Sequence, residues 1–148
     1  AEWVVPPSPA QDKAMLYFHG GGLVIGSARS HRGIVSKFVR DSGVSALVID
    51  YALAPEHPFP AALNDAVKAY RHLLDSGIGP KNIVFMGDSG GGNLVFSTML
   101  ALKGRNRPLP AAARSVAAKP ATAKRRGRPP KALAVGSSGA AARKGRKR

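Results

Sequence analysis

The sequence predicts an α/β fold in which helices flank a parallel sheet. Three short apolar runs, at residues 15–18, 44–49 and 83–86, alternate with segments whose apolar residues recur at helical spacing. Apolar runs without polar alternation are typical of strands that are buried on both faces. Strands and helices that alternate along a chain are joined by crossovers, so we expect the three strands to be parallel.

The first strand ends at a glycine-rich turn, His-Gly-Gly-Gly, at residues 19–22. Beyond this turn, two pairs of apolar residues, at positions 34 and 35 and at 38 and 39, mark one face of a helix. We expect this helix over residues 30–41, with Ser30 as its N-cap.

The second strand, residues 44–49, leads into an extended loop with three prolines between residues 55 and 60. Apolar residues at helical spacing then predict a helix over residues 63–74, and Gly77 lies just beyond it as a stop. A further helix, over residues 91–102, is expected after the third strand.

Charge divides the chain into two parts. Residues 1–102 hold all eight acidic residues and eight of the 23 basic ones, so the net charge of +15 belongs to the remainder. Residues 111–148 contain no aromatic, acidic or histidine residue. Such a segment buries too little apolar area to offset its ordering entropy. We therefore expect a domain over residues 1–110 and a disordered basic tail over residues 111–148.

The composition excludes several kinds of site. The chain has no cysteine, and its four histidines lack the spacing of metal ligands, so we expect no disulfide and no metal. No apolar run is long enough to span a membrane, and the first residues lack the features of a signal peptide. The expectation is a cytoplasmic domain, and a first residue other than Met indicates a fragment. The sequence does not indicate an oligomeric state.

The central motif is Gly-Asp-Ser-Gly-Gly at residues 87–91, between the third strand and the helix that follows. This is the context of a nucleophile elbow, in which a serine occupies a sharp, strained turn. The residues two positions away on either side need to lack side chains, and Gly87 and Gly91 meet that need. The helix also points its positive end at the place where an oxyanion would form. The motif therefore predicts Ser89 as a nucleophile.

Two other interpretations fit this motif alone. A glycine-rich turn between a strand and a helix can contain a serine with no chemical role. The same five residues also surround the nucleophile of chymotrypsin-like proteases. Those proteases are disulfide-bearing β-barrels, whereas this chain has no cysteine and alternates strands with helices.

The His-Gly-Gly-Gly turn favours the elbow interpretation over both. In esterases such a loop supplies backbone N–H groups to an oxyanion hole, together with the N–H of the residue after the nucleophile. Glycine is suited to this task because the substrate carbonyl must approach the backbone closely. The expected donors are Gly21, Gly22 and Gly90, and the alternative is a flexible loop without a role.

Three segments together resemble a known family. They are residues 17–22, residues 50–62 (Asp-Tyr-Ala-Leu-Ala-Pro-Glu-His-Pro-Phe-Pro-Ala-Ala) and residues 87–94 (Gly-Asp-Ser-Gly-Gly-Gly-Asn-Leu). Over about residues 1–112 the chain is similar to the hormone-sensitive-lipase family of α/β-hydrolases. The resemblance implies a partial α/β-hydrolase sheet and hydrolysis of short-to-medium acyl esters without a cofactor. The site residues that it implies are Ser89, the oxyanion donors Gly21, Gly22 and Gly90, and the supporting residues His19, Gly20, Gly87, Asp88, Gly91 and Glu56.

The chain departs from the family pattern at two positions. Ala52 stands where the family usually has Arg, which is expected to loosen the loop after the second strand. Gly90 stands where Ala is usual, and its effect is expected to be mild because the backbone N–H remains.

Histidines and acids before Ser89 are expected to lie outside a triad. In this fold the chain order is Ser, then Asp or Glu, then His, whereas His57 and Asp65 precede Ser89. We place His57 in the proline-rich loop and Asp65 in the next helix. His31 and His72 are expected to face solvent.

No Asp, Glu or His follows Ser89 in this sequence. The acid and base of a triad therefore cannot come from this chain in the family's order. The strands that should follow the 91–102 helix are expected to be missing, which would leave the third strand at an open edge. We therefore expect a serine ester hydrolase whose active site is incomplete in this chain. The chain by itself is expected to be weakly active or inactive.

The tail contains Arg-Gly-Arg-Pro between basic residues and resembles an AT-hook. An extended Arg-Gly-Arg strand can insert its guanidinium groups into a narrow A·T minor groove. Nucleic-acid binding through Arg126, Gly127, Arg128 and Pro129 is the alternative function. The alternatives are a polybasic segment without a specific partner, and an artefact that comes either from a frameshift in GC-rich DNA or from a junction of unrelated coding sequences.

Overall fold

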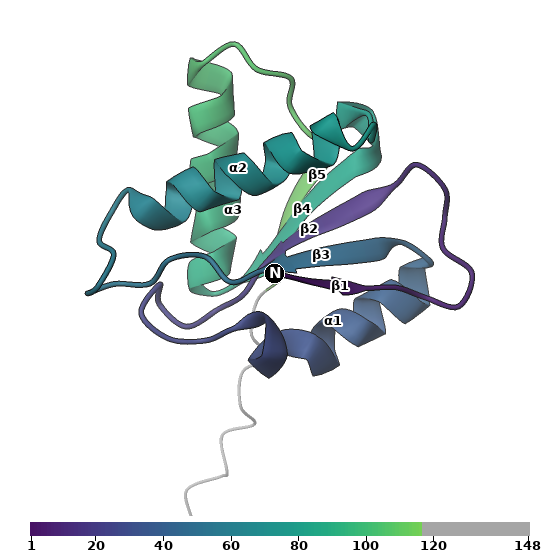
Figure 1. Ribbon diagram of the computed structural model, residues 1–148, viewed down its shortest axis with the longest axis horizontal. Helices are drawn as coiled ribbons and strands as arrows, with labels where there is room; N and C mark the ends of the chain where they lie inside the picture. Colours follow the sequence, from purple (N-terminus) through teal and green to yellow (C-terminus); the bar gives the residue numbers. More distant parts are fainter. Residues whose placement is uncertain (117–148) are drawn as a thin grey trace, which may run out of the picture.

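The computed structural model describes residues 1–116, which form a five-stranded sheet with helices on both faces (Figure 1). The strand order is β1-β3-β2-β4-β5, and β2 lies between β3 and β4 and is parallel to both. This arrangement confirms the predicted α/β class. The strands are β1 (Glu2–Val4), β2 (Ala14–Phe18), β3 (Ser45–Ile49), β4 (Ile83–Asp88) and β5 (Ala112–Val116), and the helices are α1 (Ala28–Ser42), α2 (Ala61–Asp75) and α3 (Gly90–Gly104), with a short 3-10 turn, η1 (Pro80–Asn82).

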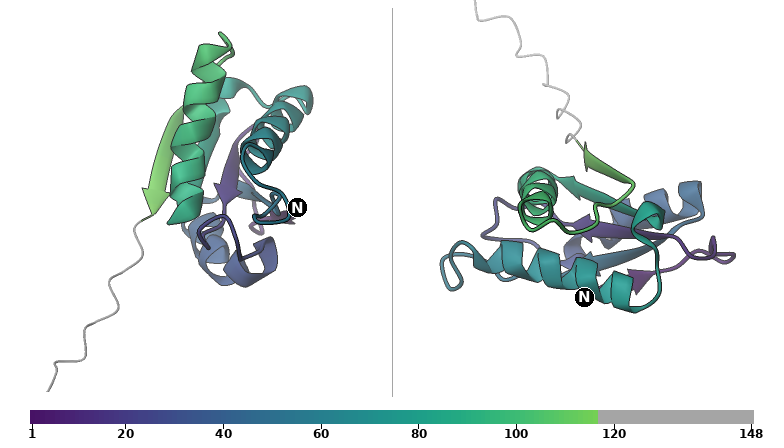
Figure 2. Two further views of the ribbon diagram at one scale, coloured as in Figure 1. Left: turned by 90° about the vertical axis from the view of Figure 1, so that its left-hand side faces the viewer. Right: turned by 90° about the horizontal axis from the view of Figure 1, so that it is seen from above.

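The sheet has a hydrophobic layer on each face. Helix α1 covers one face, and α2 and α3 cover the other (Figures 1 and 2). Because side chains alternate along a strand, β2 sends Leu16 and Phe18 toward α2 and α3, and Met15 and Tyr17 toward α1. All five residues of β2 are buried, which explains the uninterrupted apolar run in the sequence.

Strand β4 is covered less completely than expected. Its residues alternate between buried and half-buried, and Val84 and Met86 are the half-buried members. The prediction of a strand buried on both faces is therefore wrong for the α1 side of β4. On the other side, Phe85 packs edge-on against Phe18 and Tyr70, with ring centroids 5.6 and 5.1 Å apart.

The two outer strands lie outside the sequence prediction. Strand β1 pairs antiparallel with β3 and is only three residues long. Strand β5 pairs parallel with β4, so the expected open edge of β4 is occupied. Residues 112–116 form a strand, so the prediction of disorder from residue 111 is wrong for them. The rest of the expected tail, residues 117–148, lies outside the described residues.

Helix α1 begins one turn earlier than predicted. Its N-cap is Ser27, whose Oγ accepts a hydrogen bond from the Ser30 N–H at 3.1 Å. The Ser30 Oγ accepts one from the Ser27 N–H at 3.0 Å, which completes a capping box. Ser30 is thus the third residue of the first turn, since apolar periodicity marks only the part of the helix that packs on the sheet. Helix α2 ends at Asp75, and Gly77 follows in a left-handed conformation, φ 90°, as predicted.

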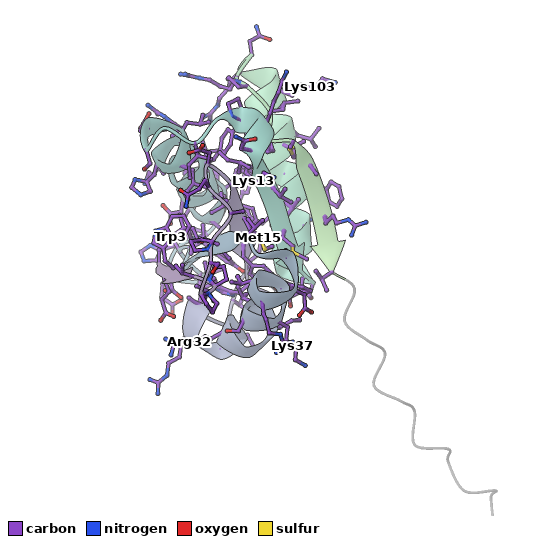
Figure 3. The ribbon with its side chains drawn as sticks, turned by 90° about the vertical axis from the view of Figure 1, so that its right-hand side faces the viewer. Trp3, Lys13, Met15, Arg32, Lys37 and Lys103 are labelled. Atoms are coloured by element: carbon purple, nitrogen blue, oxygen red, sulfur yellow. The ribbon has the colours of Figure 1, made fainter. Side chains whose placement is uncertain are left out.

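Helix α3 extends from one end of the molecule to the other. Figure 3 shows Lys103, near the end of α3, at one end and Arg32, in the first turns of α1, at the other. The carboxyl ends of β2, β3 and β4 lie at the Arg32 end, because the loop after β2 leads directly into α1. Within residues 1–116, no helix is long and apolar enough to cross a membrane.

Candidate functional site

Ser89 occupies a strained turn between β4 and α3. Its backbone has φ 47° and ψ −119°, and a positive φ is uncommon for a residue other than glycine. The residue is exposed at the carboxyl end of β4. Strained backbone of this kind persists only where neighbouring structure holds it, and it gathers at functional sites.

The turn leaves no space for side chains beside the serine. A Cβ on Gly87 would lie 2.6 Å from the carbonyl carbon of Gly91 and 2.8 Å from the carbonyl oxygen of Phe18. A Cβ on Gly91 would overlap that same Phe18 oxygen. The neighbours are backbone atoms of the end of β2 and of the first turn of α3, so they cannot move aside as the tip of a side chain can.

The glycine loop after β2 lies directly beside this turn. A Cβ on Gly90 would lie 3.0 Å from the Gly22 nitrogen and 3.2 Å from the Leu23 nitrogen. Gly21 and Gly22 both have positive φ, and the Gly21 carbonyl accepts from the N–H groups of Val24 and Ile25. Within residues 1–116, neither the Gly21 nor the Gly22 N–H donates a hydrogen bond. The two motifs therefore converge at one end of the sheet.

Asp88 joins the two motifs. Its Oδ1 accepts a hydrogen bond from the Gly20 N–H at 2.9 Å and another from the Tyr17 hydroxyl at 2.9 Å. Burial, and then the hydrogen bond to Asp88, raise the pKa of Tyr17 well above its ordinary value, so the hydroxyl keeps its proton. The residue next to the serine thus fixes the start of the glycine loop.

His31 also faces Asp88, which corrects the expectation that it faces solvent. Its Nε2 lies 3.5 Å from Asp88 Oδ2, and its ring centroid is 5.4 Å from that of His19. The early start of α1 explains this, because the first turn of the helix lies against the loop after β2. His72, in contrast, is exposed, as expected.

His19 is an internal part of the site. Its Nδ1 lies 2.8 Å from the Gly20 carbonyl oxygen and therefore carries the proton, since a carbonyl only accepts. The ring stacks on Tyr51 at 4.3 Å, and the Tyr51 hydroxyl donates to the His19 carbonyl at 2.6 Å. Burial lowers the pKa of His19 and raises that of Tyr51 to about 12. A buried, neutral imidazole suits a role in holding the loop rather than in proton transfer.

A pocket of about 300 Å³ opens beside the glycine loop. Side chains from the proline-rich loop, α2 and α3 line the pocket, and most of them are apolar. His57 is the one histidine in the lining. The sequence prediction missed this pocket, because its residues come from three segments that lie far apart in the sequence and meet only in the fold. Its lining consists of Gly22, Leu23, Ala52, Ala54, His57, Phe59, Pro60, Ala62, Leu63, Asn93, Leu94 and Ser97.

Comparison with known proteins assigns the chain to a family. A family model described as the alpha/beta hydrolase fold matches residues 15–140. The chain belongs to the α/β-hydrolase fold family.

Relatives of this α/β-hydrolase chain are named as an acetyl-hydrolase, a lipase and an esterase. It is 43% identical over 113 residues to an acetyl-hydrolase of Streptomyces hygroscopicus, covering 76% of this chain and 38% of that protein. It is 37% identical over 103 residues to human hormone-sensitive lipase, covering 66% of this chain and 10% of the lipase. A solved esterase of the bacterial hormone-sensitive lipase family matches with a TM-score of 0.75 and 47% identity, over 77% of this chain and 38% of that one. The chain therefore spans well under half the length of these relatives.

Other candidate residues of the α/β-hydrolase chain have different places. Asp65 accepts a hydrogen bond from the Ala52 N–H at 3.1 Å, which ties α2 to the loop after β3. Glu56 is exposed and has no hydrogen-bond or ion-pair partner in residues 1–116. No hydrogen bond in this part of the chain joins a histidine to Ser89. The AT-hook-like residues Arg126, Gly127, Arg128 and Pro129 lie outside the described residues, so their DNA binding stays a prediction.

Replacing Asp88 by Ala tests its place in this α/β-hydrolase site. The variant leaves the fully buried Tyr17 hydroxyl and the Gly20 N–H without their acceptor, so we expect a loss of about 2 kcal/mol in the free energy of unfolding. Urea unfolding followed by circular dichroism measures it. Asp41→Ala, which removes an exposed carboxylate, is the matched control and is expected to change stability little. Equal losses in both variants would contradict the assignment.

Proposed function

We propose that this chain supplies the nucleophile and oxyanion hole of a serine carboxylic-ester hydrolase. The observation that carries the proposal is the convergence of the strained Ser89 turn and the glycine loop at one end of the sheet. Ser89 is the nucleophile, and the backbone N–H groups of Gly21, Gly22 and Gly90 are the oxyanion donors. The names of the relatives, which include acetyl-hydrolase, esterase and lipase, support the same reaction class.

In the proposed reaction, the Ser89 Oγ attacks the carbonyl carbon of an ester. The carbonyl oxygen becomes an oxyanion that accepts hydrogen bonds from the three glycine N–H groups. The positive end of α3, which begins at Gly90, adds to this stabilisation. The alcohol leaves, and water then hydrolyses the acyl-serine ester to release the carboxylic acid. Hydrogen-bond donors that need no rearrangement during the reaction are the chief contribution of this segment.

The apolar pocket beside Gly22 is the proposed place for the hydrocarbon part of the substrate. The apolar wall of the pocket includes Leu23, Leu63 and Leu94. The polar side chains in the lining include Asn93 and Ser97. A volume of about 300 Å³ lies at the lower end of the range for small-molecule pockets. Short acyl esters are therefore the proposed substrate class.

The base and the acid of the reaction are proposed to come from outside this sequence. A serine hydroxyl is a weak nucleophile until a base takes its proton, and an acid normally orients that base. In this fold both residues follow the serine, and no Asp, Glu or His follows Ser89 here. The relatives have the additional length in which such residues are expected.

The test completes the domain. Residues 1–116 are fused to the part of the Streptomyces acetyl-hydrolase that lies beyond its match with this chain, and hydrolysis of p-nitrophenyl acetate is measured. The fusion is expected to turn over the ester, and its Ser89→Ala variant to lose at least about 10³-fold in kcat. Ser36→Ala, on the exposed side of α1, is the control and keeps the activity. A folded fusion that is equally active with Ser89→Ala would refute the proposal.

A further inference from the structure

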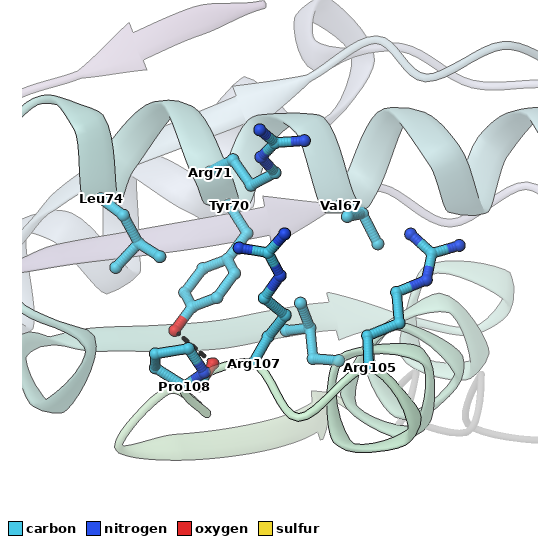
Figure 4. A pocket seen from close by; sticks show the side chains of 8 residues that line it. Val67, Tyr70, Arg71, Leu74, Arg105, Arg107 and Pro108 are labelled. Atoms are coloured by element: carbon cyan, nitrogen blue, oxygen red, sulfur yellow. Dashed lines mark hydrogen bonds between the residues drawn. The ribbon is translucent and has the colours of Figure 1, made fainter.

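A second pocket lies at the opposite end of α3 from Ser89. It has a volume of about 210 Å³ and lies between α2 and the end of α3 (Figure 4). Since α3 has 15 residues and an α-helix rises about 1.5 Å per residue, the two sites are separated by roughly 22 Å. The pocket is therefore distinct from the proposed ester site.

The floor of this pocket is apolar and well ordered by packing. Val67 and Leu102 are buried, Leu74 is partly buried, and the Tyr70 ring is fully buried beside them. The Tyr70 hydroxyl donates a hydrogen bond to the Pro108 carbonyl at 3.0 Å (Figure 4). This bond fixes the segment after α3 against α2 and keeps the pocket formed.

Three arginines surround the apolar floor. Arg71 comes from α2, and Arg105 and Arg107 extend from the end of α3 toward α2 (Figure 4). All three are exposed, and none forms an ion pair with a carboxylate in residues 1–116. Arg32 and Arg40, in contrast, are paired with Glu2 and Asp41.

Three like charges around one pocket repel each other, and an anion between them relieves that repulsion. The planar guanidinium group also matches the geometry of carboxylates and phosphates. The apolar floor, however, would gain nothing from a bare inorganic anion. The combination favours a ligand with a charged head and a short apolar tail.

We propose that this pocket binds a small amphiphilic anion, with a carboxylate or phosphate head at Arg71, Arg105 and Arg107 and a short hydrocarbon tail on the floor formed by Val67, Tyr70, Leu74 and Leu102. This site is additional to the proposed ester hydrolysis and does not depend on it. The same chemistry is present in a free short-chain acid and in the head region of an anionic lipid.

Sodium octanoate is the probe, titrated into the full ¹⁵N-labelled chain below its micelle concentration. Saturable shifts are expected at the amides of Leu74, Arg105 and Arg107. The double variant Arg105→Gln/Arg107→Gln is expected to weaken binding about tenfold, because two charge-assisted contacts are lost. The control Arg29→Gln/Lys37→Gln removes the same charge from exposed positions of α1 and leaves the affinity unchanged.

Several results would overturn the proposal. Equal binding of octanol would show that the charge is not recognised, and equal binding of acetate would show that the floor contributes nothing. Equal weakening by the control variant would reduce the effect to overall charge. Shifts confined to Gly22 and Asn93 would assign the binding to the other pocket.

Vesicles distinguish the two sources of the ligand. If sedimentation with phosphatidylglycerol vesicles falls about tenfold in Arg105→Gln/Arg107→Gln but not in the control, the ligand is a lipid head. If octanoate binds at the pocket and vesicle sedimentation is the same in all variants, the ligand is a free acid. Absence of both effects refutes the site.

Discussion

The 148-residue chain by itself is expected to hydrolyse p-nitrophenyl acetate at least about 10³-fold more slowly than the completed fusion. Losing the base of a triad costs several orders of magnitude, even where an oxyanion hole remains. In the described structure, none of the four histidines is hydrogen-bonded to Ser89, as a general base would be. His19 is buried, and its Nδ1–H donates a hydrogen bond to the Gly20 carbonyl. His31 faces Asp88. No hydrogen bond within residues 1–116 links His57 or His72 to Ser89.

The matched measurement is the rate of the unextended chain against its own Ser89→Ala variant. Because the serine is not activated, the two rates are expected to agree within about threefold. Rapid turnover that disappears in Ser89→Ala would show this expectation to be wrong. The base would then be His57, which lines the pocket beside Gly22, or a histidine from a second chain.

Gly91→Ala is expected to unfold the domain. The added Cβ overlaps the carbonyl oxygen of Phe18, at the end of the central strand β2, and neither segment can shift without breaking the β2–β4 pairing. Overpacking against fixed backbone costs about 3 kcal/mol or more, a large share of the stability of a small domain. Circular dichroism and urea unfolding at 25 °C measure the change.

Gly33→Ala is the matched control for this substitution. Gly33 lies in the interior of α1, and nothing is within 4 Å of a Cβ at this position. Alanine is the better helix former there by about 1 kcal/mol, so this variant is expected to unfold at a higher urea concentration. A Gly91→Ala variant as stable as Gly33→Ala would mean that the elbow is looser than the described geometry.

The central part of the fold can be predicted from the sequence because its signals are local. Strands β2 and β3 are buried on both faces, and that burial produces the continuous apolar runs from which they were predicted. The outer strands lack such a signal. Strand β5 has the composition Ala-Ala-Arg-Ser-Val, and it is a strand because β4 offers it a parallel partner. Pairing of this kind depends on the neighbour and is invisible in the segment itself.

The candidate site divides in the same way. The turns around Ser89 and Gly21 need glycines for steric reasons, so their positions can be found in the sequence. The contacts of Asp88 with Tyr17 and Gly20 join residues about 70 positions apart and follow only from the pairing of β2 with β4. His31 was misplaced for a related reason: its environment depends on where α1 starts, and the capping serines, rather than the apolar pattern, determine that start.

Strand β5 has a consequence for how the protein behaves in concentrated solution. Within residues 1–116 it is the last strand of the sheet, so among these residues its outer row of N–H and C=O groups has no strand partner. An edge of this kind promotes association between molecules unless charge or twist opposes it. Arg114 lies in the middle of β5 and is exposed, so each molecule presents a positive charge where a second strand would have to dock. Among residues 1–116, Arg114 is therefore a charge that would oppose edge-to-edge association through β5.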